Sequence, residues 1–191
     1  MTNTPKIKGR PKVRILESVL NKIINTVGSR PAESGGLLFG NEEDMIITDF
    51  VFDENARTTR TTYSFNVGVL NPEIKRLWTE KRLSCIGFLH SHPPGYSWPS
   101  PPDMTYFTSM FEAMPRKHYI IPILHCVPDG GYKMNTYILP NGSGEAIKAD
   151  IEILPDDYFE NNIATTTSEN NYLSKNLNAF TIMKQQIQSR L

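Results

Sequence analysis

The most constraining feature of the sequence is a pair of histidines that follows an apolar run. The run covers residues 85–89 and reads Cys-Ile-Gly-Phe-Leu, which is typical of a buried strand. His90 and His92 come next, with one residue between them. Alternate residues of an extended backbone project from the same face, so both imidazoles can reach one point. This spacing predicts a metal site at the carboxyl end of a central strand.

A carboxylate in the following Pro-rich segment is the third candidate ligand. Ser100 and Asp103 belong to the sequence Ser-Pro-Pro-Asp, which is also the pattern of a helix capping box with Pro at the first helical position. Apolar residues follow Asp103 at helical spacing, so Asp103 begins the inward face of that helix. They are Phe107, Met110, Phe111 and Met114. An inward-facing carboxylate needs a cation or hydrogen bonds, because an unpaired buried charge is costly.

Zinc fits this set of side chains. It binds imidazole nitrogen and carboxylate oxygen, and a catalytic zinc ion typically has three protein ligands and a water molecule. We therefore predict that His90, His92 and Asp103 bind Zn²⁺. The proton of a metal-bound water needs an acceptor, usually a carboxylate. The candidate is Glu33, ahead of Gly35-Gly36. An acidic residue before a strand is most often solvated, so the local pattern alone does not give Glu33 this role.

The complete pattern resembles the JAMM motif of the JAB/MPN metalloprotease family. A Glu before Gly-Gly is followed by His-Ser-His, seven residues, Ser, two residues and Asp, with every position in register. The likeness covers roughly residues 10–155. It is greater to the stand-alone prokaryotic branch than to proteasome or signalosome subunits, because the chain is short and has no long helical extension. The resemblance implies an α/β fold: a single MPN/JAB-like (cytidine-deaminase-like) domain with a mixed β-sheet flanked by helices.

The resemblance also implies a role for each motif residue. His90, His92 and Asp103 would hold Zn²⁺, and Glu33 would be the general base that later returns the proton to the leaving amine. Ser100 would donate a hydrogen bond to the oxyanion on the attacked carbonyl. The implied reaction is zinc-dependent hydrolysis of an isopeptide or peptide bond at the carboxyl terminus of a ubiquitin-like protein, in deconjugation or precursor processing.

Two alternative functions stay open at this point. One is release of an amino acid from, or processing of, a sulfur-carrier ubiquitin-like protein. The other is a catalytically silent MPN scaffold that only binds partners. Silent members generally lose motif residues, whereas this sequence keeps all of them, which favours the enzyme. A likeness in fold does not select the substrate.

The charge balance and cysteine content narrow the partners and the compartment. The 191 residues include 20 Lys and Arg and 20 Asp and Glu, so the formal net charge is zero, which argues against nucleic-acid and membrane binding. Two cysteines provide no disulfide framework, and no apolar segment has the length of a membrane span. We expect a cytoplasmic protein. The family resemblance implies that its partners are a ubiquitin-like protein or its conjugate and the enzymes of a conjugation operon.

The expected organisation along the chain has four parts. They are a flexible arm at 1–11, the metalloprotease domain at 12–155, a polar linker at 156–172 and an amphipathic helix at 173–191. For that last helix, docking on the domain is preferred over self-association and partner binding. Within the domain, a helix is expected to begin at Asn71-Pro72, with Ile74, Leu77 and Trp78 on its buried face.

Other reactive residues in the sequence are expected to be structural. His118 and His125 are assigned no ligand role, and Cys85 and Cys126 are expected to be free thiols. A cysteine nucleophile is disfavoured, because neither cysteine has an orienting histidine and carboxylate at a recognisable spacing.

Overall fold

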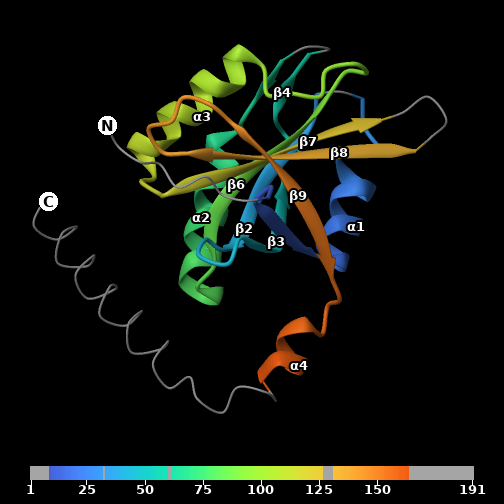
Figure 1. Ribbon diagram of the computed structural model, residues 1–191. Helices are drawn as coiled ribbons and strands as arrows, with labels where there is room; N and C mark the ends of the chain where they lie inside the picture. Colours follow the sequence, from blue (N-terminus) through green and yellow to red (C-terminus); the bar gives the residue numbers. More distant parts are fainter. Residues whose placement is uncertain (1–8, 32, 60–61, 127–130, 164–191) are drawn as a thin grey trace, which may run out of the picture. The chain divides into compact units, whose positions relative to one another are not determined.

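The computed structural model describes residues 9–31, 33–59, 62–126 and 131–163 (Figure 1). The elements follow in the order β1 (Lys12–Leu16), α1 (Glu17–Thr26), β2 (Gly35–Asn41), β3 (Ile46–Phe52), β4 (Arg57–Thr58), β5 (Tyr63–Ser64), α2 (Val67–Lys81), β6 (Ser84–His92), α3 (Pro101–Ala113), β7 (His118–Cys126), β8 (Tyr132–Pro140), β9 (Ile147–Leu154) and α4 (Tyr158–Ile163). The chain divides after Pro155 into two units, and all the strands belong to the first.

The strands of the first unit form a mixed sheet that closes on itself. Its order is β1-β3-β2-β6-β7-β8-β9, while β4 and β5 form a separate hairpin. Strand β6 pairs antiparallel with β2 on one side and parallel with β7 on the other. Closure comes from β1, which lies parallel to both β3 and β9. The expected mixed α/β fold is confirmed, and the closure into a barrel is a feature that the strand pattern did not predict.

Strand β6 is buried on both faces because helices cover the barrel from two sides (Figure 1). Helix α1 packs on one face through Val19, Leu20 and Ile23. Helices α2 and α3 cover the other face, where Phe88 of β6 meets Phe107 of α3. A strand in this position needs an almost unbroken apolar sequence, which residues 85–89 provide. The histidines extend this strand at its carboxyl end, on the face covered by α3.

Helix α2 begins earlier than expected. It starts at Val67 and contains Pro72 in its interior, so the predicted start at Asn71-Pro72 is wrong. Tertiary contacts extend the helix: Asp53 Oδ2 accepts a hydrogen bond from the backbone of the N-cap residue Asn66 at 2.7 Å, and Leu70 is buried in the core. The buried stripe therefore runs through Leu70, Ile74 and Leu77, and Trp78 is 37% exposed instead of buried.

The ends of the chain differ in part from expectation. Helix α4 occupies residues that were assigned to the polar linker at 156–172. Most of the predicted arm at 1–11 and all of the predicted helix at 173–191 lie outside the described residues. Among the helices that the structure describes, none is both long and apolar enough to cross a membrane.

Candidate metal centre

His90, His92 and Asp103 meet at the carboxyl end of β6 and the beginning of α3. The two histidine Nε2 atoms are 2.7 Å apart, and Asp103 Oδ2 lies 3.3 Å from that of His90 and 3.2 Å from that of His92. These three residues form a group whose candidate ligand atoms all lie within 4.8 Å of one another. The group combines two buried imidazoles with one partly buried carboxylate.

The spacing of these atoms fits a tetrahedral ion. Metal–ligand bonds of about 2.0–2.2 Å place neighbouring ligand atoms of a tetrahedron about 3.3–3.6 Å apart. The two separations that involve Asp103 Oδ2 are already close to this value. The two histidine nitrogens would have to move apart by about 0.6–0.9 Å to match it. The donor types of His90, His92 and Asp103 suit zinc, and two of their three separations are close to those of a tetrahedral site.

The capping box of α3 positions the carboxylate. Ser100 Oγ accepts a hydrogen bond from the Asp103 backbone N–H at 3.2 Å, and Asp103 Oδ2 accepts one from the Ser100 backbone N–H at 2.7 Å. The oxygen that completes the cap is also the oxygen that faces both histidines. The capping and metal-site interpretations of Ser-Pro-Pro-Asp therefore describe one and the same arrangement.

The pKa values of the three residues reflect their mutual interaction. Burial alone would raise the pKa of Asp103, but the hydrogen bonds with His90 and His92 outweigh it and lower that pKa well below its usual range. Burial lowers the pKa of His90. For His92 burial acts in the same direction, but the hydrogen bond and charge of Asp103, with the charge of Glu33, raise its pKa instead. Asp103 thus remains an anion next to the imidazoles, as a metal ligand must.

Glu33 lies beside this group and is 7% exposed. Its backbone N–H donates to the Thr59 carbonyl at 3.1 Å. The next residue, Ser34, donates its N–H to Ser91 Oγ at 3.0 Å, and its carbonyl accepts from the Ser91 N–H at 2.7 Å. The residue between the two histidines therefore fixes the segment that carries Glu33.

The environment of Glu33 suits a base. Burial raises the pKa of Glu33, the charge of His92 lowers it, and the charge of Asp103 raises it. Glu33 thus interacts electrostatically with two members of the His-His-Asp group. The folded chain gathers all four predicted carboxylate and imidazole side chains in one region.

The structure adds a residue to this region that the sequence analysis had set aside. His125 is the register partner of His92 in the parallel pair of β6 and β7, and their ring centroids are 6.3 Å apart. His125 is 6% exposed, and neither of its ring nitrogens has a hydrogen-bond partner among the described residues. Burial lowers the pKa of His125, and the nearby Pro93 carbonyl acts in the opposite direction. Only the register of β7 against β6 reveals this neighbour, and no local sequence signal carries that information.

His118 and Cys85 lie apart from the group. His118 begins β7, at the end of the strand away from His125. Cys85 is a free and buried thiol, and burial raises its pKa to about 12, which is unsuitable for a nucleophile.

Comparisons with known proteins agree with this architecture. Residues 17–134 match the model of a family described as prokaryotic homologs of the JAB domain. The solution structure of protein DSY2949 from Desulfitobacterium hafniense superimposes with a TM-score of 0.58 at 14% sequence identity, over 75% of this chain and 93% of that one. At this identity the similarity concerns the fold alone. A comparison with curated proteins gave no match.

Proposed function

The chain belongs to the family of prokaryotic homologs of the JAB domain, and from this premise we propose that it is a zinc-dependent hydrolase. Its substrate is an isopeptide or peptide bond at the carboxyl terminus of a ubiquitin-like protein. The observation that carries the proposal is the convergence of His90, His92 and Asp103, with Glu33 buried beside them.

His90, His92 and Asp103 would hold the ion. When bound, zinc supplies positive charge that polarises a carbonyl and makes water more acidic. Glu33 accepts the proton of the attacking water and then gives it to the leaving amine. Burial raises the pKa of this carboxylate, which brings it closer to neutral pH and makes it a better base for this task.

Ser100 contributes through its hydroxyl group. Its oxygen accepts the Asp103 N–H, so the hydroxyl hydrogen is available for donation away from the helix. An oxyanion on the attacked carbonyl is the acceptor, and a donor that is already in place needs no reorganisation during the reaction. The same side chain thus caps α3 and stabilises the transition state.

The decisive experiment measures metal content and cleavage on one preparation of the full chain. Elemental analysis is expected to give about one zinc per chain. The substrates are ubiquitin-like proteins that carry a short peptide after the terminal glycine, with an isopeptide-linked lysine peptide as the second arm and an extended sulfur-carrier protein as the third. Cleavage directly after the ubiquitin-like carboxyl terminus, lost on chelation and restored by zinc, supports the proposal. A zinc-loaded chain that leaves all three substrates intact supports the silent scaffold.

A further inference from the structure

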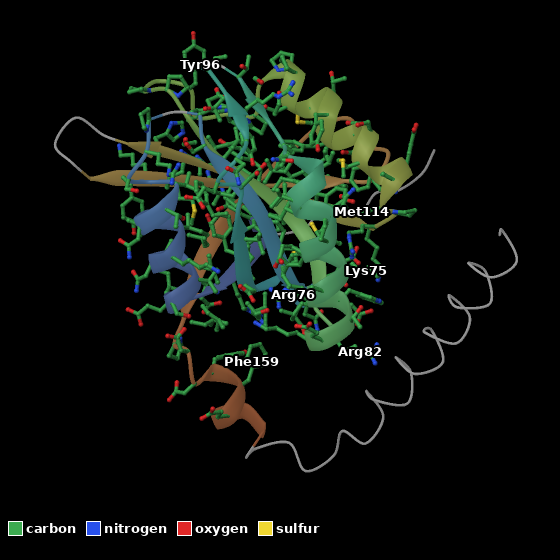
Figure 2. The ribbon with its side chains drawn as sticks, turned by 180° about the vertical axis from the view of Figure 1, so that it is seen from behind. Lys75, Arg76, Arg82, Tyr96, Met114 and Phe159 are labelled. Atoms are coloured by element: carbon green, nitrogen blue, oxygen red, sulfur yellow. The ribbon has the colours of Figure 1, made fainter. Side chains whose placement is uncertain are left out.

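The two histidines of the metal centre are held in different ways. His92 donates its Nδ1–H to the Tyr96 carbonyl at 3.2 Å, while the Tyr96 side chain projects away from the domain (Figure 2). His90 Nδ1 is buried and has no hydrogen-bond partner among the described residues. A histidine that binds a metal almost always donates its second ring N–H to a carbonyl or carboxylate, which fixes the ring. The orientation of His90 therefore depends on packing together with the contacts of its Nε2.

Tyr63 is the side chain that packs flat beside His90. The two rings are parallel within 13°, with centroids 6.2 Å apart, whereas Phe107 approaches His90 at 6.0 Å and an angle of 56°. Gly35 makes room for both rings. A Cβ at that position would come within 2.9 Å of Tyr63 Cε1 and of His90 Cβ. Gly35 is also the register partner of His90 in the pair of β2 and β6.

Tyr63 is in turn fixed by a buried carboxylate. Asp53 is 2% exposed, and its Oδ2 accepts hydrogen bonds from the Tyr63 hydroxyl at 3.2 Å and from the Asn66 backbone N–H at 2.7 Å. The Asp53 backbone N–H donates to the Gly35 carbonyl at 3.0 Å. One residue thus ties the β4–β5 hairpin and the start of α2 to the first residue of β2.

The electrostatic environment of Tyr63 favours the hydrogen bond from its hydroxyl to Asp53. Burial, the charge of Asp53 and the hydrogen bond to it all raise the pKa of Tyr63, so its hydroxyl stays protonated and remains a donor. Nothing in the catalytic proposal uses Asp53 or Tyr63. Thr59, which lies between Asp53 and Tyr63 in the sequence, accepts the hydrogen bond from the Glu33 backbone N–H.

We propose that Asp53 and Tyr63 are positioning residues of the metal centre. Asp53 holds the Tyr63 hydroxyl, and the Tyr63 ring keeps the His90 imidazole oriented with Nε2 toward Asp103. Packing of the Tyr63 ring takes the place of a hydrogen bond at His90 Nδ1, which has no such bond to the described residues. The inference depends on the metal site of the proposed function, and it predicts that two residues without any contact to the ion control its affinity.

The test measures metal affinity rather than turnover. Co²⁺ and Zn²⁺ affinities of the full chain are determined by competition with a chromophoric chelator, and the visible absorption of the Co²⁺ form reports the ligand geometry. Tyr63→Leu and Asp53→Ala are expected to weaken binding by on the order of 10- to 100-fold and to alter the Co²⁺ spectrum. Asp53→Asn keeps an acceptor for the Tyr63 hydroxyl, so it is expected to lose less affinity than Asp53→Ala.

A matched control separates positioning from general loss of stability. Tyr119 is fully buried, and its hydroxyl donates to the Met114 carbonyl at 2.6 Å, away from the histidines. Tyr119→Phe removes a hydrogen-bonded hydroxyl, as Tyr63→Phe does, but only Tyr63→Phe is expected to change metal affinity. If Asp53 acts through Tyr63, the loss in the Asp53→Ala, Tyr63→Leu double variant is smaller than the product of the single losses.

Two outcomes overturn the inference in distinguishable ways. A wild-type chain that binds neither metal overturns the proposed function together with this inference. A wild-type chain that binds metal, with Tyr63→Leu folded and unchanged in affinity and spectrum, overturns this inference alone. Tyr63→Leu decides the matter even where Asp53→Ala does not fold, because it changes no buried charge.

Discussion

Ser100 and Asp103 exchange two hydrogen bonds, each between the backbone N–H of one residue and the side chain of the other. This reciprocal cap begins α3 and, at the same time, orients the carboxylate that completes the His-His-Asp group. A structural motif worth about 1 kcal/mol in helix stability therefore also determines the geometry of the proposed metal site. Substitutions that separate the two roles provide direct tests.

Ser100→Ala removes one of the two capping hydrogen bonds and the hydroxyl donor. We expect the free energy of unfolding to fall by about 1 kcal/mol and kcat to fall by on the order of 100-fold, because the oxyanion loses a preorganised donor. Chemical denaturation and steady-state kinetics measure the two effects. Ser100→Thr keeps both functions and is the control. An alanine variant with full kcat would restrict Ser100 to helix capping.

Asp103→Asn keeps an acceptor for the Ser100 N–H but removes the negative charge. We therefore expect α3 to remain folded, while zinc content falls from about one per chain to nearly none, because a neutral amide is a poor zinc ligand. Circular dichroism and elemental analysis measure these properties. Asp44→Asn, in the exposed turn between β2 and β3, is the matched control. Retention of zinc in Asp103→Asn would show that Asp103 is not a ligand.

Glu33→Gln is expected to keep the metal and to lower kcat/KM by about 10²- to 10⁴-fold, since the base is lost while the ligands remain. Burial raises the pKa of Glu33, and a base acts when deprotonated. The rate of the wild-type chain should therefore rise with pH through a value above the usual Glu pKa of about 4.3. A pH profile of kcat/KM, with zinc content measured at each pH, tests this. If kcat/KM of Glu33→Gln still rose with pH through the same value, the group that titrates there would be a residue other than Glu33.

Asp49 is expected to make stability pH-dependent. Burial would raise its pKa, but the hydrogen bonds from Lys81 and from the Phe50 backbone, with the charge of Lys22, lower it overall. A carboxylate with a lowered pKa in the folded state stabilises the protein above its unfolded pKa of about 3.9, and this contribution disappears as the pH falls through the folded value.

Asp49→Asn should therefore lower stability near neutral pH and flatten its decline on acidification. Denaturant unfolding between pH 7 and pH 3 measures both. Asp150→Asn serves as control, because Asp150 pairs with Arg10 on the surface and both side chains are about 60% exposed. Parallel stability curves for Asp49→Asn and wild type would contradict the expected contribution.

Local patterns predicted the elements whose boundaries depend on nearby residues. The alternation of His90 and His92 places them on one face of β6, and the Ser-Pro-Pro-Asp pattern begins α3 as expected. The start of α2 was mispredicted because a distant carboxylate, that of Asp53, binds its N-cap residue. Pro72 is a strong local signal for a helix start, but here the more distant contact prevails.

The sequence by itself indicated the family and the residue types of the candidate site through the spacing of the motif residues. It indicated the mixed α/β fold through strand and helix patterns that act over a few residues. Only the tertiary structure decided that Tyr63 packs beside His90, that Asp53 anchors Tyr63 and that His125 lies next to His92. These contacts follow from strand register and barrel closure, which depend on the simultaneous burial of many distant side chains. A difference of one residue in register would turn the inward side chains to the opposite face.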